Sequence, residues 1–135
     1  ALFGNFQTFQ GFFSNIFYFV LIVGGKTMAT YNKEAVEMQV FQIISAVGTA
    51  RSCYIEAIHA AKDKDYERAA ELLKKGDVSF SEGHDSHLEL LGREAEGEAV
   101  ACLLVMHAED QLMSAEAFKL VAQELIDVYK EINKK

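Results

Sequence analysis

The chain has 135 residues, half of them apolar, and a formal net charge of −7. This length is enough for one ordinary hydrophobic core, which predicts a single folded domain. The acidic balance argues against a nucleic-acid-binding protein, because no basic stripe is available for a phosphate backbone. Cys53 and Cys102 lie far apart and in no CxxC arrangement, so we expect two free thiols in a reducing compartment.

Residues 1–27 differ in composition from the rest of the chain. They hold seven of the ten phenylalanines and one charge, Lys26, whereas all 20 acidic residues follow Met28. Their apolar run is too short for a bilayer, which needs roughly 20 residues, and it lacks the charged start and cleavage site of a secretory signal. We expect 1–27 to be a hydrophobic N-terminal extension or leader outside the domain, and 28–135 to be the domain. A short membrane anchor is the alternative for 1–27.

After Met28 the pattern predicts a first helix. Asn32 can cap it, and Glu34 lies in the first turn, where the helix dipole favours an anion. The charged stretch 62–65 predicts the turn that ends it. Apolar and small residues recur between these points in alternating steps of four and three: Val36, Val40, Ile43, Val47, Ala50, Tyr54, Ala57 and Ala61.

A second helix is predicted to begin after Asp65, which can cap it, and to end near Gly97. Glycines at 76 and 83 cost roughly 1 kcal/mol each in helix propensity, so we expect a neighbouring helix to approach closely there. The same step pattern continues through Ala69, Leu73, Gly76, Phe80, Gly83, His87 and Leu90.

A third helix is predicted from about Glu98 to Asn133. One stripe of it comprises Leu103, Met106, Asp110, Met113, Ala117 and Leu120. A second apolar surface comprises Leu104, Leu112, Phe118, Val121, Leu125, Val128 and Tyr129. Helical spacing places His107 and Asp110 one turn apart on the same side.

The near-3.5 period of each helix and the short turns predict an all-α fold, an antiparallel three-helix bundle. The second surface of the third helix can meet the other two helices, which leaves the stripe with Asp110 for another copy of the chain. Burying a carboxylate there costs several kcal/mol unless a cation, proton or partner compensates it. Periodicity alone leaves a dimer and a trimer open.

Several motifs, in order along residues 28–130, resemble the IIA component of the lactose/cellobiose/diacetylchitobiose family of the sugar phosphotransferase system (PTS). The most specific of these motifs is the one around His107. The residues that carry the resemblance are Gly48-x-Ala50-Arg51-Ser52, the stretch 57–70, Glu82-Gly83-His84, Arg93-Glu94-Ala95-x-Gly97-Glu98 and Met106-His107-Ala108-Glu109-Asp110-Gln111-Leu112-Met113.

The resemblance implies a cytoplasmic phosphoryl carrier that assembles as a homotrimer, a nine-helix bundle. His107 matches the histidine that accepts phosphate from the phosphocarrier HPr and passes it to a cysteine of the IIB component. Asp110 matches the aspartate near the threefold axis, where Mg²⁺ or another divalent cation binds. The sugar is implied to be a β-linked disaccharide such as cellobiose, diacetylchitobiose or lactose. The resemblance implies contact with the membrane only indirectly, through the IIC component.

The chemistry of the residue type agrees with this role. A histidine side chain is largely neutral at neutral pH and offers a nitrogen nucleophile. Gln111 and Ser114, further along the same helix, are candidates to hold the other ring nitrogen or a phosphoryl oxygen. We expect Glu109 to point to solvent.

The remaining histidines have simpler interpretations. His84 and His87 have the spacing of a metal pair, but zinc needs another convergent ligand. We therefore expect His87 to be a hydrogen-bonded packing residue and His59 to lie on the surface. The alternative function is a non-catalytic helical-bundle adaptor or metal-stabilised trimer that has lost phosphoryl transfer.

Overall fold

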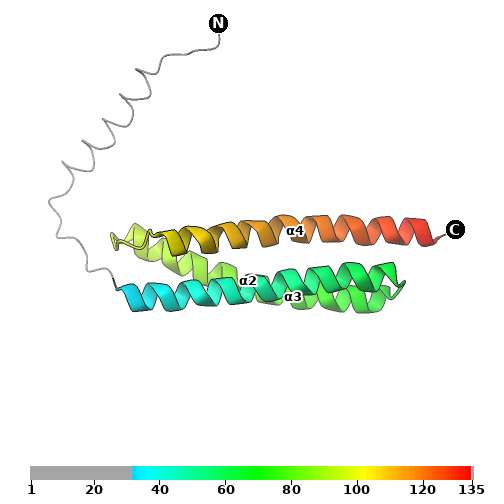
Figure 1. The fold of residues 1–135 in the computed structure, drawn as a ribbon, viewed down its shortest axis with the longest axis horizontal. Coiled ribbons are helices and arrows are strands. Elements are labelled where there is room, and N and C mark those ends of the chain that lie inside the picture. The colour runs from blue at the N-terminus through cyan, green and yellow to red at the C-terminus, as the bar shows by residue number, and fades with distance from the viewer. Residues whose placement is uncertain (1–31, 135) are drawn as a thin grey trace, which may run out of the picture. The chain divides into compact units, whose positions relative to one another are not determined.

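The computed structural model describes residues 32–134, which form three long helices: α2 (Lys33–Lys62), α3 (Tyr66–Ala95) and α4 (Leu103–Asn133). Consecutive helices run in opposite directions, so α2 and α4 are parallel to each other (Figure 1). α2 packs against both of the others, whereas α3 and α4 contact each other much less. The predicted all-α three-helix bundle is confirmed. Residues 1–27, with the predicted boundary at Met28, lie outside the described residues.

Both predicted caps are present at the starts of α2 and α3. The Oδ1 atom of Asn32 accepts a hydrogen bond from the backbone N–H of Ala35 at 3.2 Å. The Oδ1 atom of Asp65 accepts one from the backbone N–H of Arg68 at 3.0 Å. Each side chain thus satisfies a backbone donor that has no partner within its helix.

The close approach predicted at the two helical glycines is also confirmed. A Cβ atom on Gly76 would lie 2.5 Å from Cε1 of Tyr54, and one on Gly83 would lie 2.9 Å from Cγ1 of Val47. Tyr54 and Val47 are fully or almost fully buried in α2. The glycines therefore let α3 lie directly against the buried face of α2.

A polar network crosses the three helices beside this contact. The hydroxyl of Tyr54 donates to Oδ1 of Asp77 at 3.0 Å, and Nζ of Lys119 lies 2.9 Å from the same oxygen. Burial raises the pKa of Tyr54 above its ordinary value, and the hydrogen bond and charge of Asp77 raise it further. One residue from each helix thus contributes to the network.

The start of the third helix was predicted incorrectly. α4 begins at Leu103, five residues after Glu98, and residues 96–102 form a connector. Gly97 has a φ of +95°, Val100 is buried in the core, and Cys102 has an extended backbone. The connector is held by Arg93, whose guanidinium donates from Nε and Nη2 to the two carboxylate oxygens of Glu98 at 2.8 and 2.6 Å.

The packing face of α4 also differs in part from the prediction. Leu112 is buried as expected, but Val121, Leu125 and Val128 are exposed. Three alanines, Ala108, Ala115 and Ala122, are buried instead, in clusters that include residues of α2. The residues of α4 that are buried are Val105, Ala108, Leu112, Ala115, Ala122 and Ile126.

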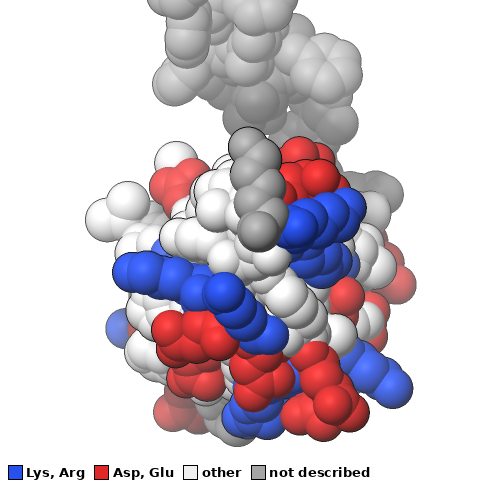
Figure 2. Space-filling view, turned by 90° about the vertical axis from the view of Figure 1, so that its right-hand side faces the viewer, with Lys and Arg blue, Asp and Glu red and all other residues white. Residues whose placement is uncertain are grey.

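Charges of both signs alternate on the end of the bundle where α2 meets α3 and α4 finishes. Figure 2 shows basic and acidic side chains interspersed on this face. Exposed ion pairs there include Arg68–Glu71, 3.1 Å apart, and Lys130–Asp127, 2.8 Å apart. This face therefore presents no continuous basic surface. Among residues 32–134, no helix is long and apolar enough to cross a membrane.

Candidate functional site

His107 lies in the second turn of α4, with an exposed side chain. Within residues 32–134 its ring makes no hydrogen bond or ion pair. Its neighbour Ala108 is buried against α2, which fixes the side of the helix from which His107 projects. The predicted nucleophile thus lies on a long helix and is exposed to solvent.

Asp110 is also exposed, in the stripe predicted to be left uncovered. The methionines one turn to either side, Met106 and Met113, are 60% and 67% exposed. Leu103 and Leu120 continue this apolar stripe, at 83% and 61% exposed. A single chain therefore leaves a carboxylate in the middle of an uncovered apolar surface.

Gln111 is held by Arg51, a residue of another helix. The Nη2 atom of Arg51, in α2, donates a hydrogen bond to Oε1 of Gln111 at 2.9 Å. Gln111 lies one turn after His107, so this bond brings a guanidinium close to the turn that carries the histidine. Arg51 was visible in the sequence as part of Gly48-x-Ala50-Arg51-Ser52, but its partner lies 60 residues away.

Glu109 was predicted to point to solvent, and this was wrong. Its Oε1 atom lies 3.0 Å from Nε2 of His87, and the two groups share a hydrogen bond between α3 and α4. The side chain of Glu109 is 40% exposed, so it keeps partial access to water while it makes this contact. The prediction that His87 is a hydrogen-bonded packing residue is confirmed.

The other residues singled out in the sequence are two histidines, Ser114 and the two cysteines. His84 is exposed, with its ring stacked on Phe80 at a centroid distance of 6.2 Å, and His59 is exposed as expected. Ser114 is exposed on α4. Cys53 is buried, and Cys102 immediately precedes α4.

A second polar cluster lies at the end of the bundle where α3 meets the connector. Arg93 donates from Nη1 to Oε1 of Gln39 at 2.8 Å, and Nε2 of Gln39 donates to Oε2 of Glu89 at 2.7 Å. The hydrogen bonds from Arg93 lower the pKa of Glu98, and those same bonds raise the pKa of Arg93. This cluster ties α2, α3 and the connector together just before α4 begins.

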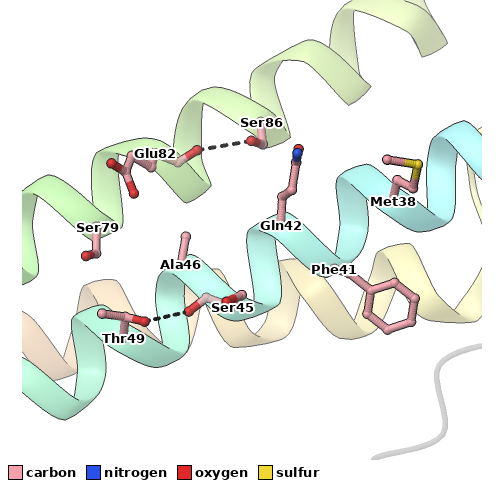
Figure 3. Close-up of a pocket in the computed structure, with 9 residues that line it drawn as sticks. All are labelled: Met38, Phe41, Gln42, Ser45, Ala46, Thr49, Ser79, Glu82 and Ser86. Carbon is pink, nitrogen blue, oxygen red and sulfur yellow. Dashed lines mark hydrogen bonds between the residues drawn. The ribbon is translucent and has the colours of Figure 1, made fainter.

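A groove of about 750 Å³ lies between α2 and α3 (Figure 3). It is lined by Met38, Phe41, Gln42, Ser45, Ala46, Thr49, Ser79, Glu82 and Ser86. The hydroxyl of Thr49 donates to the carbonyl of Ser45, and that of Ser86 donates to the carbonyl of Glu82. These donors are therefore already used within their own helices, and none of the groove residues belongs to the His107 motif.

The described part of one chain does not contain a complete set of ligands for a metal ion. No group of three His, Cys, Asp or Glu side chains within 32–134 is placed to hold an ion. One chain offers Asp110 as a single exposed carboxylate, and carboxylate oxygen is the ligand type that Mg²⁺ prefers. The residue type fits such an ion, provided that more than one copy supplies it.

Comparison with known proteins gives a consistent family match. Residues 38–130 match the family described as "PTS system, Lactose/Cellobiose specific IIA subunit". The oligo-beta-mannoside-specific EIIA component of Bacillus subtilis is 40% identical over 94 residues, which are 69% of this chain and 86% of that protein. The lactose-specific EIIA component of Staphylococcus epidermidis is 34% identical over 101 residues, 74% of this chain and 97% of that protein.

Two solved structures share the fold. The cellobiose-specific enzyme IIA of Bacillus anthracis superposes with a TM-score of 0.71 and 36% identity, covering 81% of this chain and 96% of that one. PtcA from S. mutans superposes with a TM-score of 0.70 and 31% identity, covering 73% and 98% respectively. Both matches therefore span nearly all of the solved chains.

Proposed function

Because the chain belongs to the lactose/cellobiose-specific IIA family of the sugar phosphotransferase system, we propose that it carries a phosphoryl group on His107. The group comes originally from phosphoenolpyruvate and reaches His107 from the phosphohistidine of HPr. His107 then passes it to the cysteine of the IIB component, in the cytoplasm. A IIA subunit of this system is a phosphotransferase protein that works with HPr and IIB, and the assignment to His107 is our extension of that role.

The observation that carries the proposal is the exposure of His107 on α4, within the matched region. In the first step the lone pair of a ring nitrogen forms a bond to phosphorus, while the bond from phosphorus to the HPr nitrogen breaks and its electron pair returns to that imidazole. In the second step the IIB thiolate forms a bond to phosphorus, and the electron pair of the N–P bond returns to His107. Such transfer depends on positioning and charge stabilisation more than on further covalent chemistry.

The test is direct labelling. The full chain is incubated with phosphoenolpyruvate and the general phosphotransferase components, and the phosphate is examined for acid lability and stability in base. His107→Ala should abolish the label while its melting curve stays close to that of the parent, because the side chain is exposed. Peptide mapping should place the label on His107, and a label on His84, His87 or a hydroxyl contradicts the assignment. An unlabelled parent supports the alternative, a non-catalytic adaptor.

We also propose that the uncovered stripe of α4 is the contact surface of a homotrimer. The stripe contains Met106, Asp110 and Met113, and the exposed Val121 and Val128 extend the apolar surface along the helix. Isolated monomers rarely leave so long an apolar surface open. Three copies of Asp110 brought together would repel one another, and a shared Mg²⁺ or other divalent cation would offset that repulsion.

The transported sugar is proposed from the names of the relatives. They are described as specific for oligo-beta-mannoside, lactose and lichenan, and one solved structure as specific for cellobiose. We therefore propose uptake of a β-linked disaccharide, such as cellobiose, diacetylchitobiose or lactose. The choice among them belongs to the membrane component IIC.

A further inference from the structure

The hydrogen bond between Arg51 and Gln111 joins two helices next to the turn that carries His107. Nη2 of Arg51 lies 2.9 Å from Oε1 of Gln111, and both side chains are partly buried. Within the described residues Gln111 makes no other side-chain hydrogen bond. The amide therefore has one fixed side and one side with its donors still available.

The chemistry of arginine decides which side is fixed. A guanidinium has five N–H donors and no acceptor, so the amide atom that faces it must be the carbonyl oxygen. The NH₂ group of Gln111 is then turned away from Arg51. Without Arg51 the amide would be free to exchange its oxygen and nitrogen by rotation about its last side-chain bond.

The geometry of α4 decides what the donors can reach. Gln111 follows His107 by four residues, and such pairs share one face of a helix with about 5–6 Å between their Cβ atoms. Helical side chains lean towards the N-terminus of their helix, so the amide of Gln111 extends over the turn of His107. His107 is the residue one turn back along that face, and its side chain is exposed.

Building on the proposed function, we propose that Arg51 is a positioning residue that holds the Gln111 amide with its N–H donors towards the phosphoryl group carried by His107. The amide donates to a non-bridging phosphoryl oxygen, and the guanidinium adds a positive charge on the other side of the amide. Neither residue gains or loses a proton or a covalent bond during transfer. Both act on the negative charge of the transferring group, which is where preorganised donors stabilise a transition state.

Gln111→Glu separates this proposal from a purely structural bond. The new carboxylate still accepts from Arg51, and a charge-assisted bond is stronger than a neutral one. The substitution also removes both N–H donors and places a negative charge beside the phosphoryl group. If the bond only joins the helices, the variant melts at or above the parent temperature and transfers normally. If the proposal is correct, the variant melts at or above the parent temperature and transfers slowly.

Two substitutions at Arg51 give the matching test. Lysine also donates without accepting, so Arg51→Lys keeps the amide orientation. Glutamine both donates and accepts, so Arg51→Gln no longer selects one orientation. Arg68→Gln is the matched control, because Arg68 is an exposed arginine that pairs with Glu71 near the start of α3.

The experiment is a rapid-quench measurement of single-turnover transfer from labelled phospho-HPr to the full chain. Loss of one preorganised donor typically slows a reaction by about 10²–10³-fold, so we expect about 10²-fold in Gln111→Glu. We expect transfer to be about 10-fold slower in Arg51→Gln, within twofold of the parent rate in Arg51→Lys, and unchanged in Arg68→Gln. The loss should be in the rate constant and not in the HPr concentration that gives half-saturation.

The outcomes distinguish the positioning role of Arg51 from the carrier function of His107 on which it rests. A Gln111→Glu rate within twofold of the parent, with the label on His107, overturns the positioning role and leaves the carrier function standing. Equal losses in Arg51→Lys and Arg51→Gln overturn it as well. An unlabelled parent overturns the carrier function itself. Thermal melting of each variant separates loss of transfer from loss of fold. Gln111→Met is a second variant, which removes the amide donors without adding a charge.

Discussion

Gly76 of α3 faces the ring of Tyr54 of α2 so closely that a Cβ atom on Gly76 would lie 2.5 Å from the ring carbon Cε1. The same Cβ would lie 3.2 Å from the carbonyl oxygen of Ala50, so backbone as well as ring would be crowded. Tyr54 has no exposed surface and cannot move into solvent without leaving the core. The missing side chain at Gly76 therefore sets how closely α2 and α3 pack.

Gly76→Ala should destabilise the fold although alanine is the better helix former. The helical gain is about 1 kcal/mol, whereas forcing a methyl group into a packed core typically costs about 1–3 kcal/mol, and the short contact here predicts the upper end. Urea unfolding should show a lower midpoint. Gly92→Ala is the control, because nothing lies within 4 Å of a Cβ there, and it should raise the midpoint. A higher midpoint in both variants would contradict the close contact.

Lys64, in the turn between α2 and α3, predicts a stabilising substitution. Its φ of +68° lies in the left-handed region, which costs an L-residue about 1 kcal/mol or more. Lys64→Gly should raise the free energy of unfolding by about 0.5–1 kcal/mol, because glycine adopts this conformation freely. Scanning calorimetry measures the shift. Lys62→Gly, at the last residue of α2, should lower the melting temperature, and a fall in both variants would argue against the turn geometry.

Tyr54 predicts a loss of stability in alkali. Its pKa is raised in the folded state, chiefly by burial and then by Asp77. The pKa of a tyrosine in an unfolded chain is about 10. Above that pH the unfolded chain releases this proton and the folded one keeps it, so the free energy of unfolding falls as pH rises. The contribution is fully present below about pH 10.

Tyr54→Phe isolates this effect from the other groups that titrate in alkali. The variant should be less stable than the parent at pH 8, because it loses the hydrogen bond to Asp77. Its stability should then fall less steeply between about pH 10 and pH 11. Denaturant midpoints at each pH provide the measurement, and parallel curves for the two proteins would show that Tyr54 is not protected from ionisation.

Much of the fold could be predicted because it depends on local chemistry. Asn32 and Asp65 are caps that act on residues three positions away. Gly76 and Gly83 recur at the seven-residue spacing that marks one helix face. The start of α4 could not be predicted in this way, since residues 98–102 would fit a helix as well as a connector. The fork between Arg93 and Glu98, together with burial of Val100, selects the connector.

The site was predictable to the same extent. The exposure of Asp110 follows from the stripe on which it lies, and His107 lies one turn away on the same side of the helix. The partners of the neighbouring residues do not follow from it, because Arg51 and His87 lie on other helices. Helical periodicity predicts which residues share a face of one helix. It does not predict which residue of another helix packs against them. Glu109 was misplaced for this reason.

Asp110→Leu tests the proposed trimer and its metal together. Replacing a cluster of like charges by apolar packing is often neutral or stabilising, so the variant should remain trimeric in analytical ultracentrifugation and melt at or above the parent temperature. Added Mg²⁺ should raise the melting temperature of the parent, because an ion that binds the folded state alone stabilises it. It should leave the melting temperature of Asp110→Leu unchanged.

The control is Asp127→Leu, which removes an exposed carboxylate paired with Lys130 on α4 and should keep the response to Mg²⁺. A monomeric parent at micromolar concentration would contradict both the trimer and the shared cation, while a trimer with no response to Mg²⁺ would contradict the cation alone.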